Sequence, residues 1–129
     1  MAKFKIAQNP TFKAVVDIPR VGGTVIQVPF EFKYRDRKEL AKLFAGWQES
    51  VKEDQERFKA KGDELTLIEI TDSHVERQIE QVTQLVTGWG FDDKFSAESI
   101  RALVETSAGA GDAIVDAYQK AFSAARLGN

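Results

Sequence analysis

The sequence predicts an α+β fold, mostly α, in which an N-terminal β-hairpin packs on about four helices. Two segments near the start alternate apolar and polar residues, as strands with one buried face do. A glycine-containing turn joins them, and most of the remaining chain repeats its apolar residues at helical spacing. With 129 residues and no internal repeat or disordered linker, the chain is expected to form a single domain, residues 1–129.

The predicted hairpin covers residues 12–34. Its two strands are marked by apolar residues at every second position, which are Phe12, Ala14, Val16 and Ile18 in the first and Ile26, Val28, Phe30, Phe32 and Tyr34 in the second. Between the strands, Pro19 supplies a fixed φ, and Gly22 and Gly23 tolerate the positive φ that a chain reversal requires. We therefore expect two antiparallel strands that share one buried face.

The first helix is predicted over residues 36–61. Asp36 is followed three residues later by Glu39, which is the spacing of a capping box at a helix start. Gly62 is the expected end, because glycine adopts the left-handed conformation of a C-terminal cap most easily. The apolar stripe of this helix consists of Leu40, Leu43, Phe44, Trp47, Val51 and Phe58.

Residues 63–72 are compatible with two structures. Leu65, Leu67, Ile68 and Ile70 fit either a short strand or one or two helical turns. Periodicity cannot decide between these two for a segment of this length.

Three further helices are predicted over residues 73–88, 97–106 and 112–127. Ser73 with Glu76 and Ser96 mark two starts, and small residues around Gly109 form the joint before the last helix, which is expected to stop at Gly128. The apolar stripes are Val75, Ile79, Val82, Val86 and Trp89, then Ile100, Leu103 and Val104, then Ile114, Tyr118, Phe122 and Ala125.

Charge is unevenly distributed along the chain, although the net charge is only −2. Residues 1–48 carry nine Lys/Arg and four Asp/Glu, a net charge of +5, whereas residues 49–129 carry nine Lys/Arg and sixteen Asp/Glu, a net charge of −7. The default interpretation is a solvated surface. Two others remain open, namely a basic region that attracts nucleic acid and complementary faces on successive copies of the chain. Acidic residues interrupt the basic cluster of Lys33, Arg35, Arg37 and Lys38, which weakens the nucleic-acid interpretation.

No pattern for catalysis, a cofactor or a metal emerges. The sequence has no cysteine, so disulfides and thiolate zinc sites are excluded, and the zinc motif begun by His74 cannot be completed. Lys94 follows Asp92 and Asp93 and opposes a bound cation. The glycines of 109–111 lack the preceding strand of a phosphate loop. No window has the ~18–20 apolar residues of a membrane span.

Three stretches of the chain resemble the tail assembly chaperones of long-tailed bacteriophages with non-contractile tails. The first is the hairpin region, with NPTFKAVVDIP at 9–19 and VPFEFKYR at 28–35. The second is GWGFDDKFSAE at 88–98, and the third is YQKAF at 118–122 followed by ARLGN at 125–129. Residues 52–70 depart most from the family pattern, because they are longer and more charged.

This resemblance implies a protein that is not an enzyme, that binds and solubilises the tape measure protein and that helps to recruit tail tube protein. From the residues themselves we expect no cofactor, metal, nucleic acid or membrane, and from the uneven charge we expect a homo-oligomer. The expected location is the cytoplasm of the infected or lysogenic bacterial host and not the mature virion. An amphipathic client helix would bind by lying in an apolar groove of the chaperone. The candidate partner-binding residues are Phe44, Trp47, Val51 and Phe58.

The alternative hypothesis is a structural virion component. Such a protein would be a tail or head-completion protein that remains in the particle as a ring. Purified virions distinguish the two, because a chaperone should be absent from them and a completion protein present.

Overall fold

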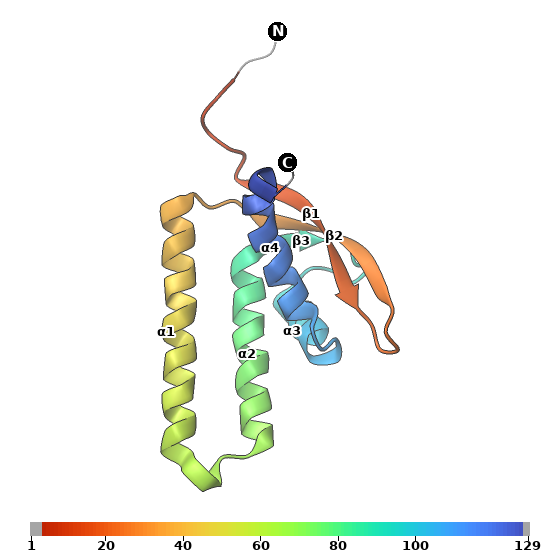
Figure 1. Ribbon diagram of the computed structural model, residues 1–129. Helices are drawn as coiled ribbons and strands as arrows, with labels where there is room; N and C mark the ends of the chain where they lie inside the picture. Colours follow the sequence, from red (N-terminus) through yellow and green to blue (C-terminus); the bar gives the residue numbers. More distant parts are fainter. Residues whose placement is uncertain (1–3, 128–129) are drawn as a thin grey trace. The chain divides into compact units, whose positions relative to one another are not determined.

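The computed structural model describes residues 4–127 (Figure 1) and confirms the predicted α+β, mostly α class. Within these residues lie three strands, four α-helices and one short 3₁₀-helix. In chain order they are β1 (Thr11–Pro19), β2 (Val25–Lys33), α1 (Arg37–Lys61), η1 (Gly62–Glu64), α2 (Leu67–Leu85), β3 (Val86–Trp89), α3 (Ala97–Thr106) and α4 (Ala110–Leu127).

The chain forms two compact units. The sheet unit contains the residues up to Tyr34 and those from Gln78 onward, and the helical-hairpin unit contains Arg35–Arg77. The first part of α2 belongs to the helical-hairpin unit and its last turns to the sheet unit.

The predicted hairpin is confirmed. β1 and β2 pair antiparallel in a register that places Phe12 opposite Phe32 and Val16 opposite Val28. Gly22 and Gly23 in the turn have φ values of 98° and 87°, which glycine tolerates and other residues rarely do. One face of the pair is buried through Val16, Ile18, Val28, Phe30 and Phe32.

A third strand, β3, was not predicted. The prediction continued the second helix to residue 88 and placed Trp89 on its stripe, but α2 ends at Leu85 and β3 follows directly. β3 pairs antiparallel with β2, so that Trp89 lies opposite Phe30 and Gly88 opposite Glu31. Thr87 Oγ1 also donates a hydrogen bond to Glu31 Oε1 at 2.8 Å. Pairing with a strand far away in the sequence therefore overrides the local helical spacing.

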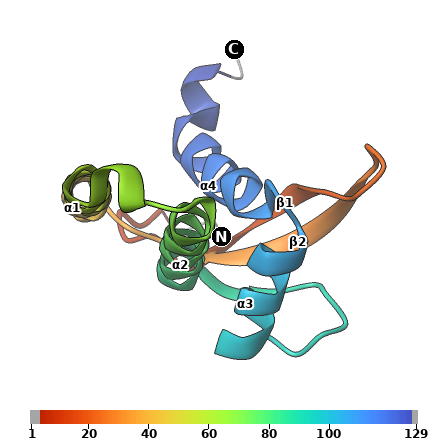
Figure 2. The ribbon, with the colours of Figure 1, turned by 90° about the horizontal axis from the view of Figure 1, so that it is seen from below.

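Helix α4 lies against β1 and closes the core of the sheet unit (Figure 2). Ile114 and Tyr118 of α4 are fully buried, and the Tyr118 hydroxyl donates a hydrogen bond to the Lys33 carbonyl oxygen at 2.8 Å. The Tyr118 ring centroid is 5.5 Å from that of Phe32 and 5.8 Å from that of Phe12. The burial of this hydroxyl is thus matched by a hydrogen bond to the sheet.

Helix α3 completes the sheet unit and begins and ends as predicted. Ser96 caps its start, because the Ser96 Oγ accepts from the Ser99 N–H at 3.1 Å. Its buried residues are Ile100, Leu103 and Val104. The next helix, α4, begins at Ala110, one half-turn before the predicted residue 112. The predicted stop at Gly128 and the side chain of Ala125 lie outside what the structure describes.

In the helical-hairpin unit, the predicted ends of α1 are confirmed. The Asp36 Oδ1 accepts from the Glu39 N–H at 2.9 Å, and the Glu39 Oε1 accepts from the Asp36 N–H at 3.0 Å. Gly62 has a φ of 54° and ends the helix. Both signals are local, which is why the sequence reveals them.

The start of the next helix differs from the prediction. The sequence pattern placed it at Ser73, whereas α2 begins at Leu67. Thr66 and Glu69 form the reciprocal hydrogen bonds of a capping box, each at 3.2 Å. The Ser73 hydroxyl instead accepts from Arg57 at 3.2 Å. Two structures were compatible with the sequence of residues 63–72, and the helical one is correct.

Two glycines beside β2 give a matched test of this packing. A Cβ added at Gly90 would lie 2.6 Å from Pro29 Cγ, whereas one added at Gly88 would meet nothing closer than 3.8 Å. We expect Gly90→Ala to lower the free energy of unfolding by about 1–3 kcal/mol through overcrowding. Gly88→Ala should change it by less than about 1 kcal/mol. Urea unfolding followed by circular dichroism measures both, and equal stabilities of the two variants would contradict the close approach of Gly90 to Pro29.

Candidate functional site

The helical-hairpin unit is held together by a buried carboxylate. Asp54 of α1 is 7% exposed. Arg77 of α2 donates from Nη2 to both carboxylate oxygens at 3.0 Å, and Arg57 Nη2 lies 2.8 Å from the Asp54 Oδ1. Arg77 Nη2 also reaches the Ser50 carbonyl oxygen at 3.4 Å. These bonds fix α1 against the first part of α2.

The ionisation of Asp54 follows from this geometry. Burial acts to raise the pKa of the carboxyl group, because it disfavours the charged form. Hydrogen bonds from Arg77 and Arg57, together with their positive charges, outweigh that effect and hold the pKa of Asp54 below its ordinary value. Asp54 is therefore a charged group at neutral pH.

A second set of polar contacts joins the two helices near their connection. Lys61 at the end of α1 donates to the Glu69 carboxylate, and this hydrogen bond lowers the pKa of Glu69. Arg57 Nη2 donates to the Ser73 hydroxyl. The connection of the two helices is thus tied by charged side chains at its surface.

A groove of about 440 Å³ lies among these residues, entirely within the helical-hairpin unit. Its apolar lining comes from Phe58, Ala60 and Leu65, and its polar lining from Arg57, Lys61, Glu69, Asp72 and Ser73. The Phe58 ring packs edge-on to His74, with 6.5 Å between the ring centroids. We call this feature the hairpin groove.

Two large apolar side chains, Leu67 and Ile68, lie on the surface. In the sequence they stand between Leu65 and Glu69, which both line the hairpin groove. Leu67 is 78% exposed and Ile68 is 73% exposed, although both belong to the first turn of α2. Large apolar residues that gather at an exposed site with a charged rim are typical of surfaces that bind other proteins.

The structure separates the four predicted partner-binding residues. Trp47 is buried, and the half-buried Phe44 packs against it with 5.2 Å between ring centroids. Val51 is 43% exposed. Of the four, Phe58 lines the hairpin groove and the others do not.

Sequence reasoning did not identify the buried ion pair of Asp54, the place of Leu65 in the hairpin groove or the exposure of Leu67 and Ile68. A signal for Asp54 was available, because position 54 lies between Val51 and Phe58 on the apolar stripe of α1. A carboxylate at such a position needs a partner from another element. The exposure of Leu67 and Ile68 depends on where α2 begins, and the sequence pattern placed that start at Ser73.

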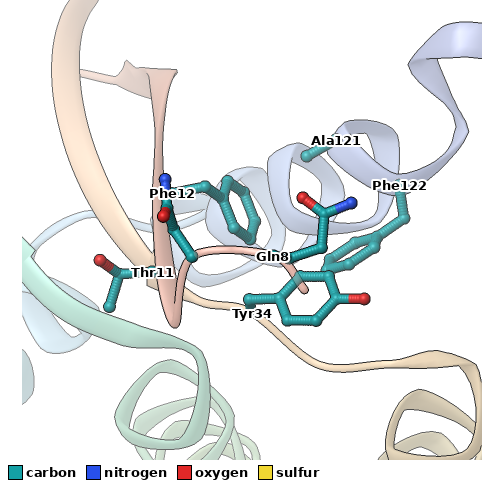
Figure 3. Close-up of a pocket in the computed structure, with 7 residues that line it drawn as sticks. Gln8, Thr11, Phe12, Tyr34, Ala121 and Phe122 are labelled. Atoms are coloured by element: carbon teal, nitrogen blue, oxygen red, sulfur yellow. The ribbon is translucent and has the colours of Figure 1, made fainter. Parts of the chain in front are cut away.

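The sheet unit carries a second pocket, of about 450 Å³ (Figure 3). Phe12 of β1, Tyr34 and Phe122 of α4 provide its aromatic lining, with 5.4 Å between the centroids of Phe12 and Phe122. Gln8 and Asn9 contribute amide groups, and Thr11 and Ala121 complete the lining. Sequence analysis gave this pocket no role.

Searches of residues 4–127 for two other kinds of site give negative results. No group of three or more His, Asp and Glu side chains in this range is arranged to hold a metal ion. No helix there combines the length and the apolar character needed to cross a membrane.

The hairpin groove and the exposed Leu67 and Ile68 are features typical of surfaces that bind other proteins. The full length of the chain, residues 1–129, matches the family model for the phage tail assembly chaperone, and the chain belongs to this family. The resemblance seen in the sequence is thereby confirmed, and the general role of the protein is in phage tail assembly. No curated protein and no solved structure matches the chain.

Replacement of Asp54 tests what holds the helical-hairpin unit together. We expect Asp54→Asn to lower the free energy of unfolding by about 1–3 kcal/mol, because Arg77 stays largely buried without this charged acceptor. The matched control is Asp116→Asn, which breaks the exposed Asp116–Lys120 pair of α4 and should cost less than about 0.5 kcal/mol. Urea unfolding at neutral pH measures both variants.

The pH dependence provides a second readout of the same site. Because the folded protein lowers the pKa of Asp54, the ionised carboxylate contributes stability above the ordinary Asp value of about 3.9. That contribution is lost as the pH falls through the folded-state pKa. The difference in unfolding free energy between the native chain and Asp54→Asn should therefore shrink below about pH 4. A difference that stays constant as the pH falls well below about 4 would contradict the role given to Asp54.

Proposed function

We propose that this chaperone binds the tape measure protein, keeps it soluble and helps to recruit tail tube protein to it. The action is one of binding and involves no catalysis. It takes place in the cytoplasm of the bacterial host, and the chaperone is released before the virion is complete. Membership of the tail assembly chaperone family supports the general role, and the surface of the helical-hairpin unit supports the mode of binding.

The observation that carries this proposal is the hairpin groove with Leu67 and Ile68 beside it. An amphipathic helix binds by placing its apolar face in such a groove while its polar face meets the rim. Here the rim carries both charge signs, from Arg57 and Lys61 on one side and Glu69 and Asp72 on the other. A client helix with mixed charges beside its apolar stripe fits this rim best.

The four candidate residues of α1 have different roles in this proposal. Phe58 and Val51 contact the client, because Phe58 lines the hairpin groove and Val51 is exposed on the same stripe. Trp47 is buried, and the ring of Phe44 packs on it, so both residues stabilise the fold of α1. Polar replacement of Trp47 would therefore report on folding and not on binding.

Self-association is also part of the proposal. Residues 1–48 have a net charge of +5 and residues 49–129 a net charge of −7, so successive copies can face one another with opposite charge. Several copies on one long client would cover its apolar stripe more fully than one.

Co-expression with the tape measure protein tests the client-binding role. The native chain should carry an otherwise insoluble tape measure protein into the soluble fraction as a stable complex. The double variant Leu67→Ser/Ile68→Ser should lower the soluble yield of the client by at least about fivefold, because it removes two large exposed apolar side chains from the proposed contact. Far-ultraviolet circular dichroism should stay unchanged, since both residues are exposed.

The matched control is Val21→Ser, which removes an apolar side chain that is 98% exposed in the hairpin turn of the sheet unit. It should leave the yield unchanged. Equal yields from the native chain and the double variant would move the client site away from the hairpin groove. If the native chain solubilises no tape measure fragment and is found in purified virions, a structural virion component replaces the proposed chaperone.

A further inference from the structure

The sheet has one long edge that no other strand of the described residues covers. The strand order is β1-β2-β3, so β1 pairs with β2 on one side only. An edge strand keeps a row of backbone N–H and C=O groups that can pair with an additional strand. Because β1 runs from Thr11 to Pro19, this edge is longer than that of β3.

A groove of about 390 Å³ follows this edge. Ala14 and Val15 of β1 line one side, and Ala113, Ala117 and Ala121 of α4 line the other. Ala121 also lines the aromatic pocket of Figure 3, so the two hollows adjoin along α4. We call this surface the edge groove. The three alanines on its α4 side leave room for large side chains from a partner.

A segment of the same chain has the side chains that would fill it. Residues 4–9, here called the arm, precede β1 and are all exposed. Phe4 is 97% exposed and Ile6 is 101% exposed, which is unusual for two large apolar residues so close together. In an extended chain they share one face, because side chains alternate with a period of two.

The arm of one copy does not lie in its own edge groove, because none of residues 4–9 lines it. Proline at position 10 holds Asn9 in extended conformations, and the Pro10 carbonyl oxygen accepts from the Tyr34 N–H at 2.9 Å. The chain bends at Pro10, and Figure 1 shows the arm continuing away from the strand.

Charge also matches the arm to the edge groove. The arm carries Lys5 and no acidic residue, whereas Asp17 and Asp116 line the edge groove. Lys120 lines it as well, and its Nζ lies 2.9 Å from the Asp116 Oδ2. A basic strand that enters beside Asp17 therefore meets a carboxylate at the rim.

We propose that the arm of one copy adds as a strand to the β1 edge of a second copy. Phe4 and Ile6 then pack against the alanines of α4, and the arm backbone pairs with β1. Each copy has one arm and one edge groove, so the contact is head-to-tail and can continue from copy to copy. This site is distinct from the hairpin groove, and its existence does not depend on client binding.

Complementation between two variants tests this contact. The arm variant, Phe4→Ser/Ile6→Ser, keeps its edge groove, and the groove variant, Ala121→Arg, keeps its arm. We expect the native chain to self-associate in sedimentation and light-scattering measurements, and either variant alone to do so about a hundredfold more weakly. An equimolar mixture of the two should form a heterodimer and stop there, because one intact arm meets one intact edge groove.

The controls separate this result from unfolding and from general loss of apolar surface. Val21→Ser removes an equally exposed apolar residue outside the arm and should associate like the native chain. Ala117→Arg blocks the same surface and replaces Ala121→Arg if circular dichroism shows that the latter is unfolded. A monomeric native chain, variants that associate like the native chain, or a mixture that stays monomeric would each overturn the proposal. All measurements omit the tape measure protein, so they do not bear on the client-binding role.

Discussion

The sheet unit depends on the burial of one face of β2. Val28, Phe30 and Phe32 are 6%, 1% and 0% exposed, and side chains of this kind contribute roughly 1.5–3 kcal/mol each when fully buried. β2 can bury them because both of its edges are paired, with β1 on one side and β3 on the other. α4 then covers the same face through Tyr118. β1, β3 and Tyr118 of α4 are thus all in contact with this strand.

The helical-hairpin unit relies on a different interaction. Its two helices are joined by the ion pairs of Asp54 with Arg77 and Arg57. Charged contacts therefore stabilise this unit, whereas apolar packing stabilises the sheet unit. A buried ion pair of this kind costs desolvation, and we interpret it as fixing the register of the two helices. Near the connection of α1 and α2, the apolar side chains of Phe58, Ala60 and Leu65 line the hairpin groove. Leu67 and Ile68 stay exposed. This division explains how a small chain keeps a binding surface without losing its core.

Both proposed contact surfaces follow from this arrangement. The hairpin groove lies where charged side chains tie two helices together, and the edge groove lies where the sheet ends at β1. One is lined for an amphipathic helix and the other for an extended segment. In the two proposals, client binding and self-association use these two separate surfaces.

The sequence by itself determined the features that depend on neighbours within a few residues. These are the hairpin with Gly22 and Gly23, the capping box of Asp36 and Glu39, the cap at Ser96 and the end of α1 at Gly62, because backbone dihedrals and local hydrogen bonds specify them. The tertiary structure decided what depends on distant partners. Trp89 joins a strand because β2 offers unpaired backbone groups, and Asp54 is buried because Arg77 lies across from it. The exposure of Leu67 and Ile68, like the free edge of β1, is likewise set by which elements pack nearby and which do not.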